Sequence, residues 1–284
     1  MNIRLVRKKI KSVSNVKKIT KAMQMVSAIK MKKAQQRAIE GKPYREDLEK
    51  IIYKVVMSLE KNFSRLMEGP VLNTNRNLVI LVTSNKGLCG AFNFNLFRYI
   101  SSKVDFAKTD FITIGKKGAL FAAKMGGNVI ADFSQSSIAD NISAVFSTAL
   151  TNFLSGKYTK VVLFYNKFIS TTRFESVDAV LLPVSISNLN PENAAEKNEY
   201  LVEPSPTTVI DSLLRSFIEG KIRGAIIESD AAEHSSRMIA MKSATDNAED
   251  VIYNLTLLRN KIRQEKITNE LLDMVTAKLS VESA

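Results

Sequence analysis

The segment that comes nearest to a catalytic or nucleotide-binding motif is Ser84–Gly90, with the sequence SNKGLCG. It follows a β-branched apolar run and precedes a stretch with helical potential, which is where phosphate-binding loops lie. It lacks the G-x-x-x-x-G-K-[ST] order of a Walker A loop, and the chain contains no G-x-G-x-x-G. A strand-to-helix joint with glycines is more often a packing turn than a phosphate site, so we expect packing here.

The single cysteine and the single histidine are the other residues that could do chemistry. Cys89 lies in the joint, where a nucleophile could sit, but His234 falls in a distant helical segment, and an isolated cysteine is usually a small buried hydrophobe. One residue of each kind makes a zinc site improbable, and no spacing singles out a pair of carboxylates. We therefore expect no catalytic residue, cofactor or metal, and a binding or mechanical role.

The net charge of +13 is concentrated near the start of the chain. Residues 1–38 hold twelve lysines and arginines and no acidic residue. A basic arm of this kind suggests an acidic partner, which could be nucleic acid, a membrane surface or an acidic protein, although a solvated lysine-rich helix face is equally compatible.

The compartment is constrained by what the chain lacks. One cysteine cannot form an internal disulfide, no apolar run approaches the roughly 20 residues that span a bilayer, and the first residues have no signal-peptide pattern. A reducing, cytoplasmic compartment fits these features.

The middle of the chain predicts a sheet with covering helices. Apolar β-branched runs at 78–82, 111–114, 129–131, 161–164 and 179–182 predict strands, and 91–104, 116–125 and 137–154 between the first four have helical potential. Such alternation is typical of a largely parallel, Rossmann-like α/β domain. The polar stretch 185–206, with three prolines, predicts a loop.

The amino-terminal region predicts a long helix with an irregular apolar stripe. The stripe positions are Ile3, Val6, Ile10, Val13, Val16, Ile19, Met23, Val26 and Ile29. Their mean spacing lies below the 3.5 residues of a regular coiled coil, so the stripe moves around the helix and one partner helix should not cover all of it.

The carboxyl-terminal region, with Thr207 or Thr208 as the candidate cap, predicts a second long helix with a stricter pattern. The expected coiled-coil seam consists of Met241, Ala244, Ala248, Val251, Leu255, Leu258 and Ile262. The next seam positions, Glu265 and Asn269, are polar, so the helix should meet a different environment there. We predict an α/β chain in which residues 1–67 and 207–284 form a long antiparallel coiled coil around a central domain at 75–206.

Several stretches resemble the gamma subunits of F-type ATP synthases. Residues 16–26 (VKKITKAMQMV) resemble the amino-terminal motif of that family, and 84–93 (SNKGLCGAFN) its middle-domain motif. Residues 237–248 (RMIAMKSATDNA) are the most specific match, and 260–271 (NKIRQEKITNEL) extend it. The resemblance covers nearly the whole chain in the expected order.

The resemblance implies a non-catalytic central-stalk rotor that couples transmembrane proton flow to ATP synthesis or hydrolysis. The implied partners are three alpha and three beta subunits, the epsilon subunit and the membrane ring of c subunits, at the cytoplasmic face of a bacterial plasma membrane. The residues that match beta-contacting positions of the family are Lys21, Met23, Arg237, Arg263, Gln264 and Thr268.

Two departures and two alternatives accompany this resemblance. Asn85 stands where the family usually has an acidic residue, and the inserted cysteine pair of plastid relatives is absent, so no thiol switch is expected. A basic coiled-coil protein that binds nucleic acid is the main alternative, but residues 1–38 have no aromatic residue for stacking. The same lack weakens a third reading, a peripheral amphipathic membrane helix.

Overall fold

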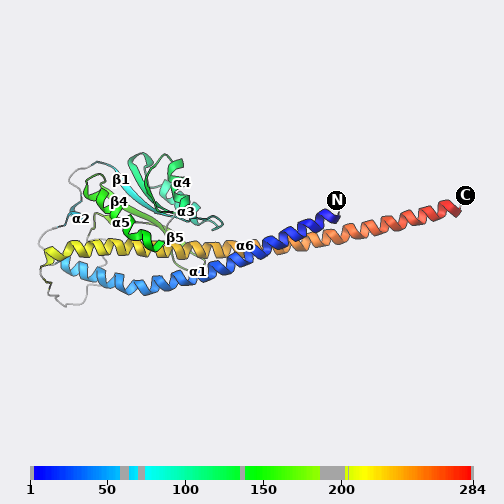
Figure 1. The fold of residues 1–284 in the computed structure, drawn as a ribbon, viewed down its shortest axis with the longest axis horizontal. Helices are drawn as coiled ribbons and strands as arrows, with labels where there is room; N and C mark the ends of the chain where they lie inside the picture. Colours follow the sequence, from blue (N-terminus) through cyan, green and yellow to red (C-terminus); the bar gives the residue numbers. More distant parts are fainter. Residues whose placement is uncertain are drawn as a thin grey trace. The chain divides into compact units, whose positions relative to one another are not determined.

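The structure is a computed structural model that describes residues 3–57, 64–69, 74–134, 138–185, 202–203 and 205–282 (Figure 1). Two long helices, α1 (Ile3–Met57) and α6 (Pro206–Glu282), lie at the two ends of the sequence. The chain forms two compact units. One, called here the helix-pair unit, combines the residues up to Ser27 with those from Met238; the other, the α/β unit, runs from Ala28 to Arg237.

The α/β unit is built on a five-stranded sheet in the order β3-β2-β1-β4-β5. The strands are β1 (Asn77–Val82), β2 (Thr109–Ile114), β3 (Asn128–Asp132), β4 (Lys160–Phe168) and β5 (Phe174–Leu182). The first four are parallel, and β5 pairs with β4 antiparallel. All five predicted strands are present, because their apolar β-branched runs suit a sheet that is buried on both faces.

Helices cover both faces of the sheet. They are α3 (Phe92–Ser101), α4 (Lys116–Lys124) and α5 (Ile138–Leu154), with the short α2 (Arg65–Glu68) and the 3-10 turn η1 (Phe106–Lys108) beside them. Alternate side chains of β1 enter different cores: Val79 and Leu81 pack with residues of α3 and α4, whereas Leu78 and Ile80 pack with residues of α5, α1 and α6. Each of these buried aliphatic side chains contributes about 1.5–3 kcal/mol to stability.

One carboxylate lies inside this apolar sheet and is fully bonded. Asp110 of β2 is 1% exposed and accepts hydrogen bonds from Arg76 and Tyr158, each at 2.5 Å, and from Asn128 at 3.3 Å. Burial by itself would raise the pKa of Asp110, but these three donors bring it below its ordinary value. The same burial and the same carboxylate raise the pKa of Tyr158.

The close approach of α4 to β1 depends on Gly115. Its φ of +112° lies in the region that favours glycine, and a Cβ there would come within 2.2 Å of the Thr83 carbonyl oxygen. The Thr83 hydroxyl then accepts the amide of Gly118 at 2.8 Å. A side chain at position 115 would separate the helix from the sheet.

Within the α/β unit, α1 and α6 run antiparallel and complete the larger core. Lys221 pairs with Glu49 at 3.4 Å, and a Cβ on Gly224 would lie 3.3 Å from the Arg45 guanidinium. Leu48 and Ile52 of α1 share one apolar cluster with Leu214, Phe217, Ile218 and Ile222 of α6 and with the sheet.

The start of α6 differs from the predicted cap. The helix begins at Pro206, and the Ser205 hydroxyl accepts the amide of Thr208 at 3.3 Å. Ser205 is therefore the capping residue and Pro206 the first helical residue, since proline needs no amide partner there. The predicted loop at 185–206 included Pro206, so the predicted helix began one residue too late.

In the helix-pair unit, α1 and α6 also run antiparallel. The hydroxyls of Thr20 and Thr245 lie 2.8 Å apart, and Lys17, one turn earlier on α1, pairs with Glu249, one turn later on α6. The predicted fold class, an α/β domain combined with a long antiparallel pair of terminal helices, is confirmed.

The predicted limits of the three segments stay predictions. Helix α1 ends at Met57, residues 58–63 lie outside the described residues, and most of the predicted 185–206 loop does too. The large core mixes residues of α1, the sheet and α6, so these segments share their apolar contacts.

Candidate functional site

The end of α6 has no partner helix opposite it within the described part of the helix-pair unit. Counting equal numbers of residues from the Thr20–Thr245 pair places Ile3, the first residue of α1, opposite Ile262. Every side chain from 263 to 278 is exposed. The polar seam positions Glu265 and Asn269 lie on this exposed stretch.

Three of the predicted beta-contacting residues lie on this stretch. Arg263, Gln264 and Thr268 are all exposed, and the Thr268 hydroxyl donates to the Gln264 carbonyl at 3.0 Å. An i,i+4 ion pair at 3.2 Å joins Lys266 to Glu270 nearby. The side chains of Arg263 and Gln264 are therefore hydrogen-bond donors on the surface of α6, and the backbone of the helix does not depend on them.

The same stretch carries unusually many exposed apolar side chains. Ile267, Leu271, Leu272, Met274 and Val275 are between 48% and 65% exposed. An exposed apolar patch of this kind is typical of a site where another molecule packs.

The seam of α6 follows a slightly different set of positions from those expected. Met241 and Ala248 are buried, and Ala244, Leu255, Leu258 and Ile262 are partly buried, whereas Val251 is 44% exposed. Ile252 takes the inward position instead, and Thr245 is buried beside Ala248. The steps from Met241 through Thr245, Ala248, Ile252 and Leu255 alternate four and three, whereas the predicted seam began with a step of three and so included Ala244 and Val251.

The apolar stripe of α1 also departs from the seam. Within the helix-pair unit Val6, Thr20 and Ser27 are buried and Val13 is partly buried, at steps of seven, whereas Val16, Ile19 and Val26 are 50–60% exposed. This agrees with the expectation that one partner helix leaves part of the stripe uncovered. Of the two contact residues predicted on α1, Lys21 is exposed and Met23 is partly buried.

The side chain of Arg237, the sixth predicted contact residue, makes its contacts within the α/β unit. It is 7% exposed, its guanidinium pairs with Glu233 at 2.7 Å, and it donates to the carbonyls of Lys86 at 3.2 Å and Gly87 at 3.4 Å. Burial raises the pKa of Glu233, and the charge and hydrogen bond of Arg237 oppose that rise. Its side chain therefore holds the loop after β1.

That loop, predicted to serve packing, closes on itself and on α6. The Ser84 amide donates to Asn93 at 3.2 Å, and the Asn93 side chain donates back to the Ser84 hydroxyl at 2.7 Å. Cys89 is buried against Phe92 and Ala232. Asn85, the departure from the family pattern, accepts the amide of Lys116 at the start of α4 at 3.0 Å, so the amide side chain serves a helix end.

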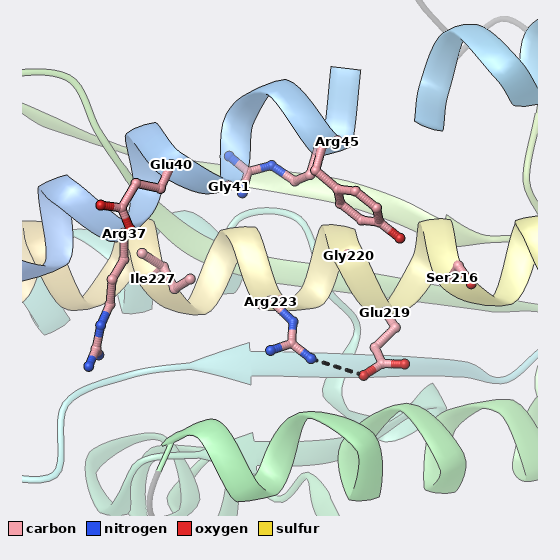
Figure 2. Close-up of a pocket in the computed structure, with 10 residues that line it drawn as sticks. Arg37, Glu40, Gly41, Arg45, Ser216, Glu219, Gly220, Arg223 and Ile227 are labelled. Atoms are coloured by element: carbon pink, nitrogen blue, oxygen red, sulfur yellow. Dashed lines mark hydrogen bonds and ion pairs between the residues drawn. The ribbon is translucent and has the colours of Figure 1, made fainter. Parts of the chain in front are cut away.

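The α/β unit also contains a groove between α1 and α6, with a volume of about 540 Å³ (Figure 2). Its lining carries both signs of charge: Arg37, Arg45 and Arg223 alternate with Glu40 and Glu219. Arg223 and Glu219 pair with one another at 3.2 Å (Figure 2). With both signs of charge in its lining, the groove defines no ligand class.

Among the described residues, no three His, Cys, Asp or Glu side chains gather in a way that could hold a metal ion. None of the described helices combines the length and apolarity that crossing a membrane requires.

Comparison with known proteins accounts for this architecture. The family model described as ATP synthase matches residues 2–280. The ATP synthase gamma chain of Variovorax paradoxus (strain S110) is 39% identical over 282 residues, covering 95% of each chain. That of Psychrobacter cryohalolentis is 35% identical over 287 residues, covering 96% of this chain and 97% of the relative.

Solved structures show the same fold. A chain from the OSCP/F1/c-ring part of the mitochondrial ATP synthase of Euglena gracilis superposes with a TM-score of 0.69 at 17% identity, covering 99% of this chain and 95% of that one. A chain from the rotor of the same enzyme gives 0.66 at 18% identity. The chain belongs to the ATP synthase family. Within that family it is a gamma chain.

Proposed function

We propose that this chain is the rotating shaft that couples ion flow through a membrane ring to ATP synthesis or hydrolysis in a surrounding catalytic head. The observation that carries the proposal is the end of α6 beyond Ile262. Its described side chains, from Arg263 to Lys278, are all exposed, and five of these are large and apolar: Ile267, Leu271, Leu272, Met274 and Val275. A helix with this surface fits inside a ring of other subunits.

The proposed partners follow from the family. The ring consists of three alpha and three beta subunits, and the epsilon subunit and the c-ring adjoin the α/β unit. Lys21, Met23, Arg263, Gln264 and Thr268 are proposed to meet beta directly. Because Arg237 binds two carbonyls of its own chain, we propose that its part in any beta contact is to hold the adjacent loop.

The chain itself is proposed to be non-catalytic. The loop that most resembles a phosphate-binding segment uses its backbone for packing, since the carbonyls of Lys86, Gly87 and Cys89 accept hydrogen bonds from α6. The purified chain should release no phosphate from ATP above the level of a preparation from cells with an empty vector. Turnover above that level would contradict this part of the proposal.

The location is proposed to be the cytoplasmic face of a bacterial plasma membrane, with peripheral attachment through the ring below. The similar gamma chains of Variovorax paradoxus and Psychrobacter cryohalolentis are bacterial, which supports this placement. The division of the chain into 1–67, 75–206 and 207–284 is likewise proposed, with the central segment near the membrane.

The decisive experiment is purification of the membrane complex through a tag on this chain. The expected preparation contains alpha, beta and epsilon subunits and the c-ring, and it pumps ions when given ATP. A tagged chain that elutes without alpha and beta would overturn the proposal. If instead the chain retained duplex DNA on a filter at high salt, the nucleic-acid alternative would be favoured. Electrostatic binding through the basic arm alone weakens steeply as the salt concentration rises.

A further inference from the structure

Three consecutive side chains of α6 bind backbone carbonyls of two different loops in the α/β unit. Ser235 donates to the carbonyl of Thr171, in the turn between β4 and β5. Ser236 donates to the carbonyl of Cys89 at 2.6 Å, and Arg237 to those of Lys86 and Gly87, in the loop after β1. All three side chains are at least nine-tenths buried.

Because these three residues are consecutive, their contacts lie on different sides of the helix. Neighbouring residues of an α-helix point about 100° apart, so three in a row contact their partners over about 200° of the helix circumference. A rotation of α6 about its own axis within the unit would break bonds on both sides of the helix at once. A single hydrogen bond or apolar contact would let the helix rotate slightly about its axis. Contacts on both sides of α6 resist its rotation in either direction.

The arginine in this group is held on both sides. Glu233, one turn earlier, fixes the guanidinium from α6 itself, and His234 lies 3.3 Å from its Nη1. A second carboxylate, Asp230, lies 3.3 Å from the other ring nitrogen of His234. The guanidinium fork is therefore pre-oriented toward the loop carbonyls, which lowers the entropy lost in binding them.

The loop that receives these bonds shows backbone strain. Leu88 has φ +62°, a left-handed conformation that is unfavourable for a residue other than glycine, and its side chain is 64% exposed. Conformations of this kind persist where the surroundings over-determine them. Here the carbonyls of Lys86 and Gly87 on one side of Leu88, and that of Cys89 on the other, are all bound by α6.

We propose that Ser235, Ser236 and Arg237 form a torsional clamp: they are positioning residues that fix the rotational angle of α6 in the α/β unit. This rests on the proposed function, because a shaft transmits torque only if its helix cannot turn within the body that is driven. The clamp lies on the last turn of α6 within the α/β unit, which ends at Arg237. The helix continues beyond it as one element to Glu282.

The first test uses the full isolated chain and does not depend on rotation. Two variants weaken the clamp: the double substitution Ser235→Ala with Ser236→Ala, and Arg237→Lys, which keeps the charge but loses the fork. Ser212→Ala is the matched control, since the Ser212 hydroxyl donates to a carbonyl of its own helix, that of Val209. Hydrogen exchange of residues 84–90 should accelerate about fivefold or more in both clamp variants and stay unchanged in the control. Unchanged exchange in both clamp variants would overturn the proposal.

The second test uses the purified complex. Variant complexes with full subunit content should hydrolyse ATP at a rate within about twofold of the parent but pump fewer ions per ATP, because the helix slips under load. Accelerated exchange with parent-like pumping would overturn the torsional role and leave the proposed function standing. If the unmodified complex did not contain this chain, or pumped equally well after the chain was removed, the proposed function would be overturned instead. If a variant failed to assemble, the exchange measurement on the isolated chain would decide.

Discussion

The hydroxyls of Thr20 and Thr245 lie 2.8 Å apart in the buried seam between α1 and α6. The Lys17 carbonyl also lies 3.0 Å from the Thr20 hydroxyl, and the Met241 carbonyl lies 2.8 Å from that of Thr245. Each hydroxyl has one proton, so one threonine donates to the other, which donates to the carbonyl of its own helix. A direct contact between two buried hydroxyls favours one alignment of the helices, because a shift along the axis would remove it. This pair therefore contributes to the register of α1 and α6 in the helix-pair unit.

Replacing one threonine of this pair with valine should loosen the helix pair. Thr20→Val or Thr245→Val alone should cost about 1 kcal/mol, and the double variant less than the sum, because the isosteric valines leave no hydroxyl unpaired. Hydrogen exchange over residues 13–27 and 238–252 measures the effect. Thr276→Val, at an exposed position with the same kind of helix-internal bond, is the control and should change nothing. Fully additive single effects would show that the two hydroxyls do not interact.

A charge placed in the seam should separate the helices, whereas the same charge on the outer face should not. Leu255 is partly buried and Leu257, on the same helix, is 52% exposed. Leu255→Asp should lower the helical content by circular dichroism and prevent assembly of the complex, because an unpaired carboxylate in an apolar contact is costly. Leu257→Asp should keep the helical content of the parent. Equal behaviour of the two variants would contradict the assignment of the seam.

The apolar runs of the sheet could be located from sequence because strands buried on both faces leave a continuous signal. The alternation of Val79 and Leu81 with Leu78 and Ile80 between two cores is a consequence of that signal. The helix seams were harder to predict, since hydrophobicity pointed to Ile19 and Ala244, while the polar residues Thr20 and Thr245 are buried. The steps of seven from Val6 through Val13 and Thr20 to Ser27 were present in the sequence and would have located the α1 seam.

The contacts of Arg237 could not be predicted in the same way. Its guanidinium binds the backbone carbonyls of Lys86 and Gly87, about 150 residues away. Every residue has a backbone carbonyl, so the sequence does not indicate which one is bound. The family resemblance predicted that Arg237 contacts the beta subunit, whereas its side chain is buried in the folded chain. Arg263 and Gln264, by contrast, were marked by the polar interruption of a regular seam, and the structure places both on the exposed end of α6.

Removing the donors of that exposed end should affect coupling and spare the fold. The double substitution Arg263→Ala with Gln264→Ala should give a complex with parental subunit content and reduced ATP-driven pumping, because arginine can bind a carboxylate of beta through two donors. Each lost charged hydrogen bond costs about 1.5–3 kcal/mol if it is desolvated in the complex. Lys261→Ala, an exposed cation on the same helix, is the comparison variant. Parental pumping by the double variant would remove these two residues from the proposed contact.

Glycine at position 88 should relieve the strained backbone of the loop after β1. Leu88→Gly should leave stability unchanged or raise it by up to about 1 kcal/mol, because relief of the left-handed conformation offsets the greater entropy of the unfolded chain. Leu88→Val should lower stability, since a β-branched residue tolerates positive φ least. Leu120→Gly, at a similarly exposed leucine inside α4, should cost about 1 kcal/mol. A thermal melt of each variant decides, and a loss in Leu88→Gly equal to that in Leu120→Gly would refute the argument from strain.

Stability toward acid should depend on Asp110. Its folded pKa lies below the unfolded value of 3.8, so its ionised form stabilises the fold fully above about pH 5 and the contribution is lost as pH falls through the lowered pKa. Asp110→Asn should melt several degrees below the parent at pH 7, because Arg76 loses its ionic partner and Tyr158 a charged acceptor. The gap between the two melting temperatures should narrow as pH falls below about 4, where the parent loses the same interaction. Asp273→Asn, on the exposed end of α6, should track the parent at every pH. A gap for Asp110→Asn that stayed constant from pH 7 to pH 3 would show that the carboxylate contributes through packing alone and that its charge does not stabilise the sheet.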